Sequence, residues 1–101
     1  MWDLFKRITT EIRKYDKNHI IYIDGNGWGN NYSGFPGAWD DNMVISFHKY
    51  WSPNKQTDIS FALDLREKFN MPLWLGESGE NSNKWFTDCI SLLEKNKIGW
   101  A

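Results

Sequence analysis

The sequence has no apolar run that could cross a membrane. Its longest apolar stretches are about five or six residues, whereas a transmembrane helix needs roughly 20 consecutive apolar residues. The N-terminal segment also lacks the continuous apolar region of a signal peptide. Membrane association is therefore not expected, and the signal sequence of a secreted protein would have to lie elsewhere.

Cysteine and clustered charge are also scarce. The single cysteine, Cys89, excludes an internal disulfide, and its place in an apolar helical pattern indicates a buried, unreactive thiol. The formal charge is -1, from 12 basic and 13 acidic residues, with no long run of one sign. Nucleic acid is not an expected partner, because little in such a chain attracts a phosphate backbone.

Aromatic residues, in contrast, are abundant at 17% of the chain, with seven tryptophans. Trp28, Trp39 and Trp51 lie in segments rich in Gly, Asn, Asp and Pro, where packing gives little reason for them. Exposed aromatic faces suit flat apolar ligand faces, including those of pyranose rings. Loop packing explains each of these tryptophans, taken alone, equally well.

The apolar spacing predicts helices and strands that alternate within one globular domain. The predicted elements are, in order, a helix at 2–17, strands at 19–24 and 43–47, a helix at 58–69, a strand at 73–77, a helix capped by Ser82, and an apolar run at 97–101. This order is typical of an α/β fold whose parallel strands are joined by right-handed crossovers.

Polar side chains follow three of the predicted strands, at residues 24–31, 48–52 and 77–80. The carboxyl ends of parallel strands lie at one edge of a sheet. Open α/β sheets and (β/α)₈ barrels build their active sites at that edge. These three clusters are therefore the candidate functional segments.

Two familiar motifs come close in these clusters, and each fails at one position. Residues 25–30 approach the dinucleotide-binding pattern G-x-G-x-x-G, but Asn30 stands where the third glycine is required and more loop follows. Residues 76–80 approach the G-x-S-x-G elbow of serine hydrolases, but Glu80 replaces the last glycine. Nucleotide binding and serine hydrolysis are both disfavoured.

What remains is a carboxylate, Glu77, at one strand end, with His48 and Tyr50 at a neighbouring strand end. A nucleophilic carboxylate must be ionised, and nearby hydroxyl or imidazole donors favour that form. His48 and Tyr50 are two residues apart on an extended segment, so they point to the same side. The spacing alone is equally consistent with a structural alternative, in which Glu77 caps a loop amide and His48 has only a structural role.

Three stretches together resemble, in order and spacing, the second half of a glycoside hydrolase family 5 catalytic domain, one of the cellulase-like (β/α)₈ barrels. They are residues 12–21 (IRKYDKNHII), the His48-x-Tyr50 pair and residues 74–79 (WLGESG). The resemblance implies an α/β fold that is the C-terminal half of a (β/α)₈ TIM barrel, strands 5 to 8, incomplete. Residues 1–101 would then form one partial catalytic domain, a half-barrel, with no separate second domain.

The same resemblance implies roles for single residues. Glu77 maps onto the retaining nucleophile of the family. His48 and Tyr50 map onto residues that line the site beside it, with the Tyr50 hydroxyl bonded to the nucleophile. Trp28 and Trp51 are expected to bind substrate. The acid/base glutamate of the family ends the fourth barrel strand, so it is expected to lie outside this chain.

Two other carboxyls, Asp24 and Glu80, are candidates for the second catalytic group, and neither is a convincing substitute. Asp24 is expected to hold the loop at 25–29, and Glu80 is expected to be solvated. The isolated chain should therefore be inactive. The resemblance implies that the full-length parent is an endo-β-1,4-glucanase-like enzyme, secreted or extracellular. Its substrate would be β-1,4-glucan or a related plant polysaccharide, and no cofactor or metal is expected.

An alternative from another class is a non-catalytic carbohydrate-binding α/β fragment that uses its loop tryptophans for affinity. The absence of the acid/base residue motivates it. In either case, half of a barrel leaves open sheet edges and exposed apolar surface, so self-association through these edges is expected.

Overall fold

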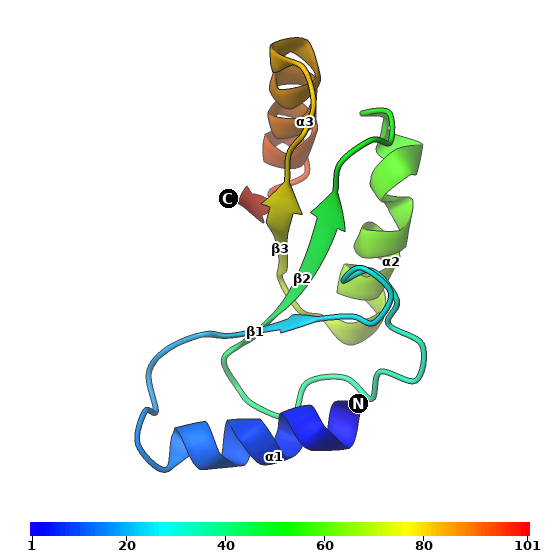
Figure 1. Ribbon diagram of the computed structural model, residues 1–101. Helices are drawn as coiled ribbons and strands as arrows, with labels where there is room; N and C mark the ends of the chain where they lie inside the picture. The colour runs from blue at the N-terminus through cyan, green and yellow to red at the C-terminus, as the bar shows by residue number, and fades with distance from the viewer.

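The computed structural model describes all 101 residues as an open, four-stranded parallel sheet with helices (Figure 1). The elements are, in chain order, α1 (Trp2–Arg13), β1 (Ile21–Asp24), β2 (Met43–Lys49), the 3₁₀ helix η1 (Gln56–Ile59), α2 (Ser60–Phe69), β3 (Leu73–Ser78), α3 (Asn83–Lys95) and β4 (Gly99–Trp100). The predicted alternation of helices and strands is confirmed. None of the helices is long and apolar enough to span a membrane.

The strand order is β1-β2-β3-β4, and every neighbouring pair is parallel. β1 pairs with the first part of β2, from Ile21 opposite Met43 to Asp24 opposite Ser46. β2 continues beyond the end of β1, and there it pairs with β3 alone. All four carboxyl ends therefore point to one edge of the sheet, as the order of elements predicts.

Helix α1 ends at Arg13, several residues short of its predicted end. The Asp16 carboxylate accepts hydrogen bonds from the backbone N–H groups of Asn18 (2.9 Å) and His19 (3.0 Å), and this turn competes with further helix. The Arg13 guanidinium donates to the carbonyls of Asp16 and His19, which fixes the same turn. Side-chain hydrogen bonds thus set this boundary, and apolar periodicity does not report them.

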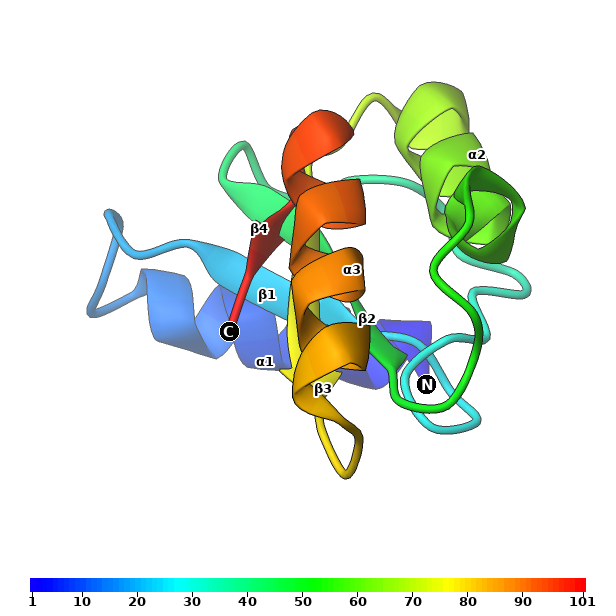
Figure 2. The ribbon, with the colours of Figure 1, turned by 90° about the horizontal axis from the view of Figure 1, so that it is seen from above.

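Helices α2 and α3 cover one face of the sheet, and the hydrophobic core lies between them and the central strands (Figure 2). Ile45 and Phe47 of β2 are fully buried in this core, as is Leu93 of α3. Cys89 of α3 is buried as predicted, and its burial raises the pKa of the thiol. The apolar runs of the sequence therefore form the contacts that hold the helices on the sheet.

Helix α1 packs against the long loop between β1 and β2. Its Trp2 stacks on Tyr32 at a centroid distance of 5.6 Å and packs against Phe35 at 5.1 Å. Trp39 is partly buried against the core, and its Nε1 donates a hydrogen bond to Thr9 Oγ1 at 3.0 Å. Of the two explanations that the sequence left open for Trp39, loop packing holds, because this ring joins the loop to α1.

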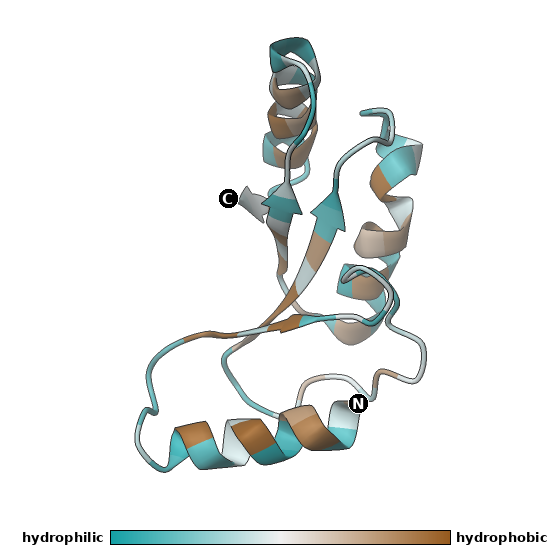
Figure 3. Ribbon diagram, in the orientation of Figure 1, coloured by the Kyte–Doolittle hydropathy of each residue, from teal (hydrophilic) through white to brown (hydrophobic).

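The other face of the sheet and the outer side of α1 have no covering element. A groove between α1 and β1 is lined by Ile8, Ile12, Ile20 and Tyr22, all of them exposed. Figure 3 shows apolar residues repeated along α1. Tyr22 packs edge-on against Trp74 of β3 at 5.6 Å on the open face. This is a considerable apolar surface for a chain of this size.

Candidate active site

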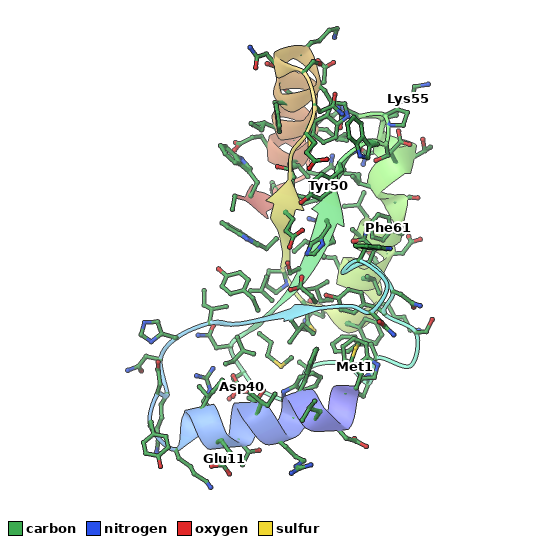
Figure 4. All side chains as sticks on the ribbon, in the orientation of Figure 1. Met1, Glu11, Asp40, Tyr50, Lys55 and Phe61 are labelled. Atoms are coloured by element: carbon green, nitrogen blue, oxygen red, sulfur yellow. The ribbon has the colours of Figure 1, made fainter.

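Three neighbouring strand ends bring four polar side chains together. Asp24 is the last residue of β1, and His48 lies near the end of β2. Tyr50 follows β2 directly, and Figure 4 shows it at the carboxyl end of that strand, beside β3. Glu77 lies near the end of β3. The structure thus gathers the three polar residues that the sequence singled out, and adds Asp24.

One oxygen of the Glu77 carboxylate has two neighbours. The Tyr50 hydroxyl donates a hydrogen bond to Glu77 Oε2 at 3.0 Å, and His48 Nδ1 lies 3.3 Å from the same atom. The other nitrogen of the imidazole, Nε2, lies 3.3 Å from Asp24 Oδ1. His48 therefore bridges two carboxylates, while Glu77 Oε1 has no hydrogen-bond donor from the protein.

A β-bulge turns Glu77 toward this group. Phe47 of β2 lies opposite Leu75, but the next residue, His48, lies opposite Glu77, so Gly76 is an extra residue on β3. In a regular strand, Glu77 would share the face of Leu75, which is buried in the core. The extra residue instead places the carboxylate on the side of His48.

The hydrogen bond to Glu77 raises the pKa of Tyr50, and partial burial and the negative charge of Glu77 add to the effect. Tyr50 is therefore protonated, and a hydrogen-bond donor, throughout the neutral pH range. Its position is also fixed: Asn81 Nδ2 donates to the Tyr50 carbonyl at 2.8 Å, and Gly79 lies against its ring. The turn after β3 thus holds the residue that donates to Glu77.

The loop after β1 presents Trp28 at the tip of a short hairpin. Backbone bridges between Gly25 and Gly29 and between Asn26 and Asn31 close this hairpin. Trp28 is 93% exposed and has a φ of 60°, a left-handed conformation that is uncommon for a bulky side chain. Such strained positions cluster at functional sites. Trp28 is therefore an exposed aromatic ring at the tip of the loop that follows β1.

The loop after β2 carries Trp51, which is 69% exposed. A buried lysine, Lys49, anchors this loop: its Nζ donates to the carbonyls of Ser52 (3.0 Å) and Pro53 (2.7 Å). The same ammonium lies 5.3 Å from the centroid of the Trp85 ring, and burial lowers the pKa of Lys49. The signal for this role in the sequence is a basic residue, Lys49, at the end of an otherwise apolar strand.

The two other carboxyls near the site, Asp24 and Glu80, differ in their contacts. Asp24 faces His48 and makes no side-chain hydrogen bond to the loop at 25–29, so the expectation that it holds that loop is wrong. Glu80 is exposed and has no side-chain partner, which agrees with a solvated role. No group of three or more His, Cys, Asp or Glu side chains is arranged to hold a metal ion.

A sequence model of a known family, described as cellulase (glycosyl hydrolase family 5), matches residues 1–101, the whole chain. The chain belongs to glycosyl hydrolase family 5. No curated protein matches it. Family 5 enzymes are (β/α)₈ barrels, so the four parallel strands and their helices form an incomplete part of such a barrel. The predicted fold and the glycosyl hydrolase class are confirmed, and family 5 implies a carbohydrate substrate.

Proposed function

We propose that this chain supplies the nucleophile side of a retaining β-glycosidase site, with Glu77 as the nucleophile. The observation that carries the proposal is the state of the Glu77 carboxylate. Oε2 accepts from Tyr50 and faces His48, while Oε1 has no protein partner. The contacts to Oε2 fix the orientation of the carboxylate. The other oxygen is left to attack.

In the proposed reaction, Glu77 Oε1 forms a bond to the anomeric carbon as the glycosidic bond breaks. The leaving oxygen takes its proton from a second carboxyl. Water then attacks the glycosyl-enzyme ester, gives a proton to that second carboxyl, and releases Glu77. Retaining enzymes place the two carboxyls about 5 Å apart on opposite sides of the bond.

No carboxyl of the chain fits the second role. Asp24 contacts Nε2 of the His48 ring and Glu77 contacts Nδ1, so one imidazole joins the two carboxylates and Asp24 does not face Glu77 across a cleft. Glu80 is in the turn that follows β3, three residues beyond Glu77, rather than across from it. We therefore propose that the acid/base residue lies in a part of the barrel outside these 101 residues. The chain alone is expected to give no hydrolysis above background.

The proposed substrate is β-1,4-glucan or a related plant polysaccharide, cleaved by a secreted or extracellular parent enzyme. The support is the pair of exposed rings, Trp28 and Trp51, on the loops that flank Tyr50 and Glu77. Aromatic faces of this kind offer apolar contact to the flat faces of pyranose rings. His48 and Tyr50 complete the proposed substrate-binding set beside the nucleophile.

The test uses Glu77→Gln in the complete enzyme, with Glu80→Gln as a matched control three residues away. Loss of the nucleophile is expected to cost about 4 kcal/mol or more, which lowers kcat for an aryl β-cellobioside by about a thousandfold. The control should keep its kcat within about twofold. A Glu77→Gln enzyme with normal turnover would refute the proposed role.

A second measurement identifies the attacking residue directly. A 2-fluoro cellobioside with a dinitrophenyl leaving group needs no proton donor, so it should leave a stable sugar ester on the nucleophile. Mass spectrometry of peptides is expected to find that ester on Glu77 and none on Glu80. An ester on any other carboxyl would transfer the role to that residue.

The exposed rings of Trp28 and Trp51 also favour a second candidate function, binding of carbohydrate without turnover. Titration of cello-oligosaccharides into the chain, followed by tryptophan fluorescence, separates the two. Quenching at millimolar sugar that disappears in Trp28→Ala and Trp51→Ala, in a complete protein that remains inactive, would favour the binding function.

A further inference from the structure

The peptide groups of His48 lie beyond the end of the neighbouring strand. The last pair between β1 and β2 is Asp24 opposite Ser46, and His48 follows two residues later. On the β1 side of β2, the N–H and C=O of His48 therefore have no strand to pair with. Unpaired backbone groups at this point would let the end of β2 move.

The side chain of Asn30 takes the place of the missing strand. The His48 N–H donates to Asn30 Oδ1 at 2.8 Å, and Asn30 Nδ2 donates to the His48 carbonyl at 2.9 Å. A carboxamide offers one acceptor and one donor as a peptide group does. Asn30 thus adds one more rung to the sheet, at the residue that faces Glu77.

The same loop also holds the imidazole ring of His48. Gly29 is buried and has a φ of 88°. A Cβ at this position would lie 2.7–2.8 Å from ring atoms of His48, so the ring lies directly on the Gly29 backbone. Asp24, the last residue of β1, lies beside Nε2 of the ring. The end of β1 and its loop therefore constrain the backbone of His48, one face of its ring and one ring nitrogen.

We propose that Asn30 is a positioning residue that sets His48 and, through it, the Glu77 carboxylate. The inference rests on the proposed role of Glu77. His48 Nδ1 is already 3.3 Å from Glu77 Oε2, near the limit for a useful contact, so a small shift of His48 removes it. Asn30 makes no hydrogen bond to the carboxylate, and both polar atoms of its side chain are bonded to the His48 backbone, through which it acts.

This role also explains the segment 25–31, whose glycines and asparagines fit no nucleotide motif. Asn30 occupies the position where a dinucleotide loop needs glycine, and in this fold that position needs a carboxamide. The backbone turn at Gly29 gives the His48 ring its space. The segment is therefore a support for His48 that also carries Trp28 at its tip.

The test compares Asn30→Ala and Asn30→Asp with Asn26→Ala in the complete enzyme. Asn26 is in the same hairpin, but its side chain accepts only from the Gly27 N–H and does not reach His48. Misplacement of a reacting group by about 1 Å costs about a hundredfold, so we expect kcat to fall by about 10- to 100-fold in both Asn30 variants. KM should change by less than about twofold, because Asn30 does not bind sugar.

Asn30→Asp separates hydrogen bonding from packing. Aspartate has nearly the shape of asparagine, but it cannot donate to the His48 carbonyl. A low kcat in Asn30→Asp supports the proposal even if Asn30→Ala folds poorly. If Asn30→Asp retains normal kcat, or if Asn26→Ala loses as much as the Asn30 variants, the proposal is overturned.

Amide hydrogen exchange in the 101-residue chain gives a readout that needs no activity. Exchange at the His48 N–H is expected to speed up by about tenfold or more in Asn30→Ala and to stay unchanged in Asn26→Ala. Unchanged exchange at His48 would overturn the inference. An active Glu77→Gln enzyme would instead overturn the proposed function, so the two failures are distinguishable.

Discussion

Gly76 offers a sharp test of how Glu77, the proposed nucleophile, is oriented. A Cβ on residue 76 would overlap Ser46 Oγ, whereas Ser46 Cβ would be at 3.7 Å, an ordinary contact. The backbone of Gly76 is outside the left-handed region, so it accepts alanine without strain. The conflict therefore comes from a single oxygen atom. Removing that atom in Ser46→Ala should remove the conflict.

Two opposing effects set the magnitude. Alanine in place of glycine stabilises a compatible site by about 0.4–1 kcal/mol, through the lower entropy of the unfolded chain. Overpacking a buried site costs about 1–3 kcal/mol, and Ser46 is buried. Gly76→Ala alone should therefore lower the free energy of unfolding by about 1–2 kcal/mol. In the Ser46→Ala background it should raise that free energy by up to about 1 kcal/mol.

The assay is a double-mutant cycle on the 101-residue chain. Urea unfolding of the four proteins is followed by tryptophan fluorescence at one protein concentration and extrapolated linearly to water. We expect a coupling of about 1–3 kcal/mol between positions 46 and 76, and a coupling near zero in the matched cycle with Ser78→Ala. In the complete enzyme, Ser46→Ala should also restore kcat lost through Gly76→Ala.

A neutral Gly76→Ala, or a coupling as small as that of the Ser78 control, would refute this reasoning. It would mean that the bulge accepts a side chain and that glycine is not what aims Glu77. The double variant could also recover stability relative to Gly76→Ala without recovering kcat. That result would show that the bulge packs correctly again but that the Glu77 carboxylate does not regain its position beside His48 and Tyr50.

Three further predictions concern the Tyr50 hydroxyl, the Arg13–Asp40 ion pair and the open edges of the sheet. Tyr50→Phe removes the donor to Glu77 and should lower kcat/KM of the complete enzyme by about tenfold, measured with an aryl β-cellobioside. The Arg13 hydrogen bond lowers the pKa of Asp40 to about 2 from 3.8, so the contribution of this ion pair is full above 3.8 and is lost as pH falls toward 2. Asp40→Asn should accordingly lower the free energy of unfolding by about 1 kcal/mol at pH 7, with a smaller difference in acid urea titrations. The isolated chain should self-associate in sedimentation, because β1 and β4 are open edges and the groove beside α1 is apolar.

Each of these has a contradicting result. Normal kcat/KM in Tyr50→Phe would show that the 3.0 Å hydrogen bond to Glu77 is not used in the reaction. If Asp40→Asn lowers the free energy of unfolding equally at pH 2 and pH 7, the loss does not come from the charge of Asp40. A chain that sediments as a monomer at all concentrations would show that the open edges do not pair.

The sequence was informative where many residues share one pattern. The segments at 19–24 and 43–47 are apolar runs, and both strands were predicted to within a few residues. Only the second is buried throughout, because Ile20 and Tyr22 of the first are exposed. The order of the elements also predicted that Glu77, His48 and Tyr50 lie at neighbouring strand ends, whereas the contact between Tyr50 and Glu77 was implied by the family resemblance. Parallel strands that alternate with helices must end at one edge, whatever the details of the loops.

Contacts made by a single side chain could not be predicted from the apolar pattern or from the order of the elements. The Asp16 turn that ends α1, the pairing of Asp24 with His48, and the carboxamide rung of Asn30 each need a partner distant in the sequence or a specific loop path. The packing of Trp39 stayed undecided in the sequence because its partner, Thr9, is on α1, and periodicity cannot place that helix beside the loop. Composition describes the residues of a loop and does not give their contacts.

The exposure of the site shows what the chain lacks as a catalyst. The Glu77 side chain is 54% exposed, so its contacts with Tyr50 and His48 operate in a largely aqueous environment where charge interactions are weak. The same contacts become stronger once water is excluded. In the proposed enzyme, the remainder of the barrel would therefore have two separate effects: it would supply the proton donor and raise the strength of contacts already present here. A proton donor added alone, without cover over Glu77, is expected to recover only part of the activity.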